Sequence, residues 1–250
     1  YLMSIMGNDT SYSVDVSNVG NPTRTWRFLD EYNVAASANL LFKHKLLDFA
    51  ANLNSGINYS FKNRSYNVLG YSLTAYNAGQ ISFTGNPDEI MNSLLSETNS
   101  QSGFHIIGGR QLSNIYDGSL SNASIYLSEE LNLNKKLKSI IGLRSEHYQQ
   151  YYTGQNQAGD KYSNKLVLKD IGVFPSLNVI YDISNKSKLR FSLSKTTARP
   201  SFKEKSLATI YDGISSITFN GNIDLEVTNI NNFDFRYELY FEKNQTVSFS

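Results

Sequence analysis

The side chains that usually carry catalysis and metal binding are scarce in this chain of 250 residues. It has no cysteine, which excludes thiolate nucleophiles, thiolate metal sites and disulfide bonds. Its three histidines, His44, His105 and His147, lie far apart and have neither metal-ligand spacing nor the pattern of a Ser-His-Asp triad. Scattered carboxylates in a strand-rich chain are no evidence of a glycosidase pair. We therefore expect no enzymatic activity, no metal and no cofactor.

With catalysis and metal binding disfavoured, the cationic and aromatic side chains of the chain suggest ligand recognition instead. The candidate ligand-binding residues are Arg24, Trp26, Arg27, Tyr66, Arg110, Tyr116 and Arg199. An aromatic ring beside cations, as in segment 17–30, suits a ligand platform, but it is also typical of an interfacial aromatic girdle, which we favour. In Arg199-Pro200 the guanidinium could pair with Glu204 or bind an anionic ligand. We favour a structural role there, because proline suits the place where a strand leaves its sheet.

The overall composition argues against several protein classes. The 23 Lys and Arg residues balance 22 Asp and Glu residues, and a formal net charge of +1 excludes a strongly basic nucleic-acid-binding protein. The 28 Asn and 33 Ser residues are poor helix formers, so a helical bundle is disfavoured. The longest unbroken apolar runs have three residues, as at 40–42, whereas a transmembrane helix needs about 18.

Hydrophobic periodicity predicts long β-strands. Apolar and polar residues alternate over segments 31–43 and 47–62, which places one set on each face of a strand. The same alternation recurs over 229–242. Weaker versions run through 119–134, 137–152, 173–183, 188–197 and 245–250, and Glu129 interrupts the apolar set of the first of these. Segment 47–62 keeps its phase for 16 residues, or about 50 Å, whereas strands of soluble proteins usually have about five or six residues. A tilted strand of this length exceeds the apolar band of an outer-membrane barrel, which is about 25 Å tall.

The expected connections alternate in length along the chain. Short links, as at 44–46 and 184–187, alternate with long ones at about 17–30, 63–118, 153–163 and 198–228. This alternation is typical of antiparallel up-and-down strands that have tight turns at one end and long loops at the other. We therefore predict an all-β fold, a segment of about ten strands of a transmembrane β-barrel, with residues 1–250 in a single barrel domain.

Two smaller expectations concern the longest loop and the ends of the chain. Pro87 and the apolar spacing that follows it predict a short helix over 87–95. Tyr1 is not an initiator Met, and Ser250 stops inside an alternating run, so we expect an internal fragment of a longer polypeptide.

Several motifs resemble those of TonB-dependent outer-membrane receptors of the Bacteroidetes type. Arg199-Pro-Ser-Phe-Lys-Glu204 is similar to the family's Arg-Pro-x-Phe-x-Glu segment, and Gly142-Leu-Arg-Ser-Glu146 resembles its Gly-x-Arg-x-Glu strand. The chain departs from the family at Asn222-Ile-Asp-Leu-Glu-Val227, where both prolines of the pattern Asn-Pro-x-Leu-x-Pro are absent. The motif residues, for which we expect structural roles, are Arg144, Glu146, Arg199, Pro200, Phe202, Glu204, Gly221, Asn222, Asp234, Arg236 and Glu238.

The resemblance implies a barrel of about 22 strands around an N-terminal plug that lies outside this fragment. Its setting would be the outer membrane of a Gram-negative cell, in contact with outer-membrane lipids. External loops and the plug would bind a scarce nutrient, such as a siderophore, glycan or peptide, and the TonB complex would drive uptake through the plug. A surface lipoprotein or other outer-membrane subunits are further candidate partners, and nucleic acid is not.

Other readings of the sequence stay open. A receptor-like barrel could serve as a scaffold subunit of a larger outer-membrane complex, and a soluble β-sandwich, such as a carbohydrate-binding module, is the third alternative. Inside a barrel, the alternating charges of Arg144 and Glu146 and of the segment 234–238 would face a hydrated lumen. We expect them to form ion pairs that fix strand register, in preference to direct contacts with a substrate.

Overall fold

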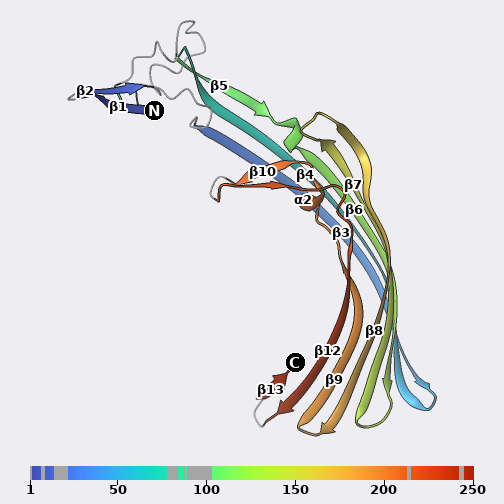
Figure 1. The fold of residues 1–250 in the computed structure, drawn as a ribbon. Coiled ribbons are helices and arrows are strands. Elements are labelled where there is room, and N and C mark those ends of the chain that lie inside the picture. Colours follow the sequence, from blue (N-terminus) through green and yellow to red (C-terminus); the bar gives the residue numbers. More distant parts are fainter. Residues whose placement is uncertain are drawn as a thin grey trace. The chain divides into compact units, whose positions relative to one another are not determined.

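The structure, a computed structural model, describes residues 2–6, 9–13, 22–77, 84–86, 88, 103–212, 215–241 and 245–250 (Figure 1). The strands are β1 (Leu2–Met6), β2 (Asp9–Ser13), β3 (Thr23–Leu46), β4 (Phe49–Tyr76), β5 (Gly103–Arg110), β6 (Tyr116–Asn132), β7 (Leu137–Gln155), β8 (Lys161–Ser184), β9 (Ser187–Ala198), β10 (Thr209–Asp212), β11 (Ile217–Asn220), β12 (Thr228–Tyr240) and β13 (Thr246–Phe249). Short helical elements include η3 (Leu112–Asn114) and α2 (Phe202–Lys205). Among these residues, no helix has the length and apolar character needed to cross a membrane.

The predicted up-and-down arrangement of antiparallel strands is confirmed. In the described part of the chain, nine strands share one sheet in the order β13-β12-β9-β8-β7-β6-β4-β3, and β5 also pairs with β4. The ladders of β6 with β7, β7 with β8 and β8 with β9 are all antiparallel. Two separate hairpins, β1–β2 and β10–β11, complete the strands. The nine strands of the sheet agree with the expectation of about ten.

The chain divides into two compact units, which are described separately. One contains residues 1–29 and 66–115, and the other contains residues 30–65 and 116–250. In the first unit, β5 extends the sheet along β4, with Leu69 opposite Arg110 and Tyr76 opposite Gly103. The second unit contains the long ladders of β6 to β9 and β12, and it is there that the two faces of the sheet differ most clearly.

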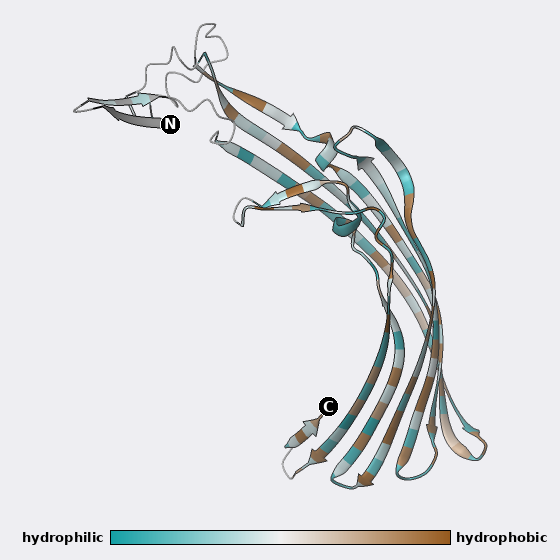
Figure 2. Ribbon diagram, viewed as in Figure 1, coloured by the Kyte–Doolittle hydropathy of each residue, from teal (hydrophilic) through white to brown (hydrophobic). Residues whose placement is uncertain are grey.

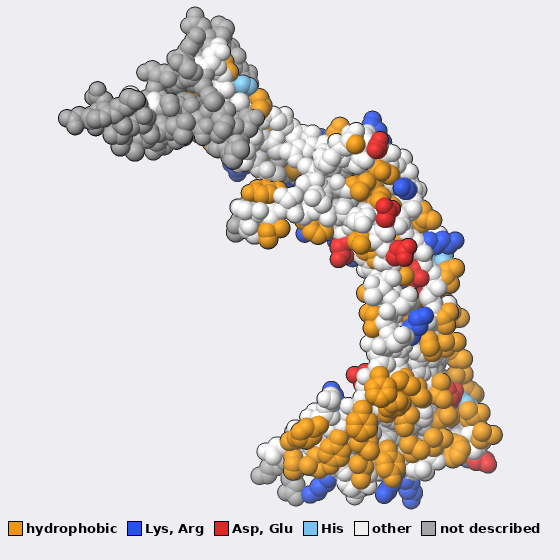
Figure 3. Space-filling model, viewed as in Figure 1, with side chains coloured by type: hydrophobic (Ala, Val, Ile, Leu, Met, Phe, Trp, Pro, Cys, Tyr) orange, Lys and Arg blue, Asp and Glu red, His pale blue; other side chains and the backbone are white. Residues whose placement is uncertain are grey.

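In this second unit the alternating sequence separates an apolar face from a polar one. Large apolar side chains on one face are 50 to 68% exposed, namely Ile125, Leu127, Ile141, Leu143, Ile171 and Val173. Brown and teal alternate along β8, β9 and β12 in Figure 2, and hydrophobic side chains cover the lower part of these strands in Figure 3. The opposite face carries charged residues such as Arg144 and Glu146 on β7. An exposed apolar face of this extent needs a hydrocarbon environment.

Tight turns join the strands at one end of the sheet, as the sequence predicts, although the β3–β4 turn lies at 47–48 and not at 44–46. Leu47 and Asp48 connect β3 to β4 with φ angles of +48° and +67°, the left-handed pair that a two-residue hairpin requires. Between β6 and β7, the Asn134 side chain accepts hydrogen bonds from the backbone N–H groups of Lys136 and Leu137. Such a turn fixes register, so it also fixes which residues face which side.

The long connections are shorter and more ordered than expected. β3 already begins at Thr23, so Arg24, Trp26 and Arg27 belong to a strand and not to a loop. The expected loop 63–118 contains the second half of β4 and all of β5, and segment 198–228 contains α2, β10 and β11. These extensions were missed because apolar and polar residues are mixed on both faces, as at Ile106 and Ile107 on β5, which erases the two-residue signal. The helix expected over 87–95 lies outside the described residues, apart from Asp88.

Candidate binding surface on the polar face

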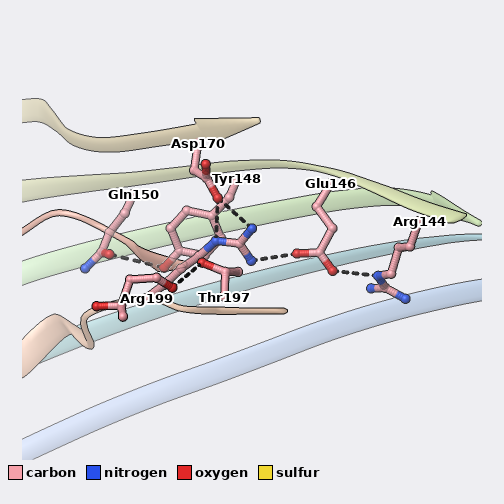
Figure 4. A network of polar contacts seen from close by, with 8 residues as sticks. Arg144, Glu146, Tyr148, Gln150, Asp170, Thr197 and Arg199 are labelled. Atoms are coloured by element: carbon pink, nitrogen blue, oxygen red, sulfur yellow. Dashed lines mark hydrogen bonds and ion pairs between the residues drawn. The ribbon is translucent and has the colours of Figure 1, made fainter. Parts of the chain in front are cut away.

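Arg199, just beyond the end of β9, is the centre of an ion-pair network on the polar face (Figure 4). Its Nε and Nη2 donate to Oδ2 of Asp170 on β8 at 3.0 and 2.8 Å, and its Nη1 donates to Oε2 of Glu146 on β7 at 2.6 Å. The other carboxylate oxygen of Glu146 accepts from Nε of Arg144 at 2.6 Å. The network therefore links two cations and two anions across three neighbouring chain segments.

Aromatic rings surround the Arg199 guanidinium on its remaining sides. Its Cζ lies 4.7 Å from the centre of the Tyr148 ring and 5.9 Å from that of Phe174, distances typical of cation–π contacts. The Tyr148 hydroxyl in turn donates to Oε1 of Gln150 at 3.1 Å. Only 13% of the Arg199 side chain is exposed and it binds two carboxylates, so we assign it a structural role that links β7, β8 and the end of β9. It does not pair with Glu204, the alternative that the sequence suggested.

Glu204 instead caps the N-terminus of the helix α2. Its carboxylate accepts from the backbone N–H of Ser201 at 2.7 Å, and the Ser201 hydroxyl accepts from the N–H of Glu204 at 3.3 Å. This reciprocal capping box satisfies two backbone donors that would otherwise lack partners. The backbone N–H of Ser201 lowers the pKa of Glu204, because it stabilises the ionised carboxylate. Pro200 lies between the end of β9 and this cap, where its missing N–H costs no ladder hydrogen bond.

Phe202 fixes α2 against the polar face. Its ring is only 6% exposed, and it lies over Gly118 on β6, where an added Cβ would be 2.6 Å from a ring carbon. The Arg64 guanidinium covers the same ring at 5.4 Å, while its Nη2 pairs with Glu31 on β3. The Phe202 ring therefore fits only because position 118 has no side chain.

Two of the candidate ligand-binding residues are buried. Tyr66 is 8% exposed and Tyr116 is 2% exposed. The Tyr116 ring stacks on that of Tyr152 at 5.9 Å, and the Tyr152 hydroxyl accepts from the backbone N–H of Leu207, just after α2. A ligand could stack on Tyr116 only after this local packing had opened.

Lys205 is a structural residue that the sequence did not single out. It is 1% exposed, and its ammonium donates to the Leu225 carbonyl at 2.6 Å, which ties α2 to the segment that enters β12. Burial lowers the pKa of Lys205, and the nearby carboxylates of Asp224 and Glu226 oppose that effect. Nothing in the local sequence distinguishes this lysine from exposed ones, because its partner lies 20 positions away.

The motif residues Gly221 and Asn222 complete the same local structure. The Asn222 N–H donates to the Glu204 carbonyl at 2.7 Å. At Gly221 an added Cβ would lie 2.2 Å from the Ser206 carbonyl oxygen and 2.7 Å from that of Lys203. Glycine is therefore required by the close approach of the two backbone segments. We call residues 199–208 together with 221–225 the α2 knot.

A second charged cluster joins β9 and β12. Arg190 lies directly opposite Arg236 in the ladder, an arrangement that is unfavourable without a shared anion. Glu238 supplies it, at 2.9 Å from Arg190 and 3.9 Å from Arg236, and also accepts from the Tyr240 hydroxyl at 2.6 Å. Asp234 accepts a hydrogen bond from Ser192. The carboxylate of Glu238 is 9% exposed while the two arginines are 43% and 52% exposed, so cations line the surface here.

The remaining candidates lie in the first unit and stay exposed. The Arg24 guanidinium lies 4.8 Å from the centre of the Trp26 ring, which meets Tyr71 edge-on at 5.8 Å. Trp26 is 37% exposed, and Arg27 is exposed beside it. On β5, Arg110 donates to the Asn67 side chain at 2.8 Å. Trp26 therefore combines a cation and a second aromatic ring in one accessible cluster.

Comparison with known proteins identifies the family. The family described as "TonB dependent receptor-like, beta-barrel" matches residues 5–250. No curated protein sequence matches the chain. Among solved structures, the chain is similar to the ferric citrate transporter FecA in its unliganded form, with a TM-score of 0.53 and 14% identity, over 87% of this chain and 26% of that one. Similarity to the copper transporter OprC has a TM-score of 0.28 and 6% identity, over 91% and 46% of the two chains.

The extent of these matches decides what they show. At 14% identity the likeness to FecA concerns the fold alone, and the chain spans about a quarter of that protein's length. The family match, by contrast, covers almost every residue and agrees with the apolar and polar faces of the sheet described above. It confirms the resemblance that the motifs carry. The chain therefore belongs to the family of TonB-dependent receptor-like β-barrels, which are outer-membrane proteins.

Proposed function

We propose that this chain is part of an outer-membrane receptor that takes up a scarce nutrient, such as a siderophore, glycan or peptide, with energy from the TonB complex. The observation that carries the proposal is the family match over residues 5–250. All 250 residues would belong to one barrel domain of a Gram-negative outer membrane. The TonB complex would act on a plug that lies outside this segment, and a surface lipoprotein is a further candidate partner.

Within this function, we assign the candidate residues to two groups. Arg199, Phe202 and Glu204 hold the α2 knot on the polar face, because each is committed to contacts within the chain. Ligand contacts would fall to exposed residues, namely Arg24, Trp26, Arg27 and Arg110. The Trp26 ring would stack on a planar group of the ligand, and the Arg24 guanidinium beside it would bind an anionic group.

The test is uptake by cells that lack the full-length gene. Growth on single siderophores, glycans and peptides should be lost for one class and restored by the wild-type gene, and a protonophore should abolish that uptake. In the restored strain, Trp26→Ala should lower ligand affinity, while Lys45→Ala, an exposed residue beside the β3–β4 turn, should not. Unchanged uptake of every nutrient, together with stoichiometric partner proteins on purification, would instead support a scaffold.

A further inference from the structure

The apolar face of the sheet contains a hollow that no established role explains. It has a volume of about 590 Å³, and its lining includes the small side chains of Ala36, Ala38, Ala123 and Ser145. These come from β3, β6 and β7, while Ile57, Ile125 and Ile171, which are 58 to 68% exposed, rise around them. A cluster of small residues within a face of large apolar ones leaves a local depression in the surface that meets hydrocarbon.

The rows of paired residues show where polarity returns along this face. Leu127 lies opposite Leu143, and two residues further along Ile125 lies opposite Ser145. The next row on the same face joins Ala123 to His147 and His147 to Ile171, and the row beyond that joins Gln149 to Lys169. Lys169 therefore introduces a cation on this face within about two rows of the apolar pairs, or roughly 13 Å along the strands, and the pair of Tyr151 and Leu166 follows beyond it.

Two polar groups at this boundary are unpaired. His147 lines the hollow and Lys169 lies one row beyond it, and both are exposed. In the described residues neither side chain has an ion-pair partner, whereas the lysines and arginines of the polar face are largely paired with carboxylates. A cation next to an apolar hollow suits an amphiphile that has an anionic headgroup and a hydrocarbon chain.

The size of the hollow argues against a protein segment as its occupant. A helix about 10 Å wide that rises about 1.5 Å per residue fills roughly 120 Å³ per residue, so about five residues would fill the space. That is less than two turns, which is too little for a helix that crosses the bilayer. An acyl chain is narrower, and it can follow the alanine-lined floor while its headgroup stays at the polar boundary.

We propose that this hollow, formed by Ala36, Ala38, Ala123, Ser145 and their neighbours, binds an acyl chain of a phosphate-bearing membrane lipid, with its phosphate at Lys169 and His147. The inference rests on the membrane-facing side of the barrel and not on transport, so loss of nutrient uptake would leave it unaffected. It assigns a lipid site to one defined place on a face that would otherwise contact any lipid equally.

The first experiment fills the hollow. The full-length barrel is purified in mild detergent, exchanged into dioleoylphosphatidylglycerol, washed, and analysed by native mass spectrometry for retained lipid. Ala123→Phe should lower the retained lipid at least about fivefold, because even one or two displaced methylene groups account for that factor. Ile183→Phe is the matched control, since it also places Phe on the apolar face, near the β8–β9 turn. Folding of each variant is checked by gel mobility without heating.

The second experiment tests the headgroup. Lys169→Gln should remove the preference for phosphatidylglycerol over phosphatidylcholine while retaining some lipid, and Lys161→Gln, at the exposed start of β8, should leave the preference intact. Equal retention by wild type and Ala123→Phe would overturn the proposal. So would equal losses in Ala123→Phe and Ile183→Phe, or a protein bound stoichiometrically to this face in place of lipid.

Discussion

Replacing Arg199 with leucine should destabilise the barrel far more than removing a neighbouring arginine. The substitution leaves Asp170 and Glu146 without their shared cation, although their side chains are only 16% and 11% exposed. Breaking a buried ion pair on one side costs about 3–5 kcal/mol. Partial exposure, and the second partner that Glu146 keeps in Arg144, reduce the expected loss to about 3 kcal/mol.

Arg144→Leu is the matched control. Arg144 is 40% exposed and contacts only one carboxylate of the network, so its loss should cost about 0.5 kcal/mol. Arg199→Lys should give an intermediate result, because an ammonium cannot reproduce the three guanidinium contacts and loses about 1.5 kcal/mol or more of charged hydrogen bonding. Arg144→Leu tests whether loss of any positive charge from the network lowers stability, and Arg199→Lys tests whether stability depends on the geometry of the guanidinium contacts.

The assay is urea unfolding of the full-length barrel in detergent, followed by the loss of its folded mobility on an unheated gel. The order of midpoints should be wild type, Arg144→Leu, Arg199→Lys and Arg199→Leu, from highest to lowest. A double-mutant cycle with Asp170→Asn should show coupling of about 1–3 kcal/mol, because the two residues share two hydrogen bonds. Equal midpoints for Arg144→Leu and Arg199→Leu would refute the central role of Arg199.

Three further predictions concern the polar face. Gly56→Ala should destabilise the barrel by about 1–3 kcal/mol, since the new Cβ would lie 2.7 Å from the Tyr126 ring. Asn39 is the other side chain that the Cβ would meet, so the loss, measured from the urea midpoint, should be smaller in an Asn39→Ala background. Lys205→Met should make the α2 knot at least about tenfold more sensitive to proteinase K by removing the hydrogen bond to Leu225, while Lys203→Met should not. The lowered pKa of Glu204 means that its stabilising contribution is present above the pKa of the unfolded chain, about 4.3, and is lost as pH falls through the lower folded value. The protection factors of the α2 amides, corrected for the intrinsic exchange rate at each pH, should therefore fall below about pH 5 in wild type, and Glu204→Gln should abolish that dependence.

The sequence predicted the faces of the sheet well, and for a clear physical reason. Segment 47–62 alternates because one side meets hydrocarbon and the other meets water, so period and environment coincide. Where apolar and polar residues are mixed on both faces, as around Arg24 and Arg110, that signal disappears; the start of β3 was therefore predicted too late and β5 was missed. Glu129, which interrupts the apolar set of β6, has a partner in His44 on β3, with a carboxylate-to-ring distance of 3.5 Å. Ala51 of the intervening strand is small and 2% exposed, which leaves room for that contact.

The register of strand pairing decides which side chains meet on the polar face, and this register cannot be read directly from the sequence. The sequence offers many carboxylates as possible partners of Arg199, and the actual partners, Asp170 and Glu146, lie 29 and 53 positions away on two different strands. The burial of Tyr116 likewise depends on Tyr152 and on the segment that follows α2, which only tertiary structure brings together. Packing alone therefore decides which of the candidate ligand-binding residues are buried in structural contacts and which stay exposed. The α2 knot uses Arg199 and the neighbouring aromatics for structure, and the exposed cluster around Trp26 keeps the chemistry that a ligand could use.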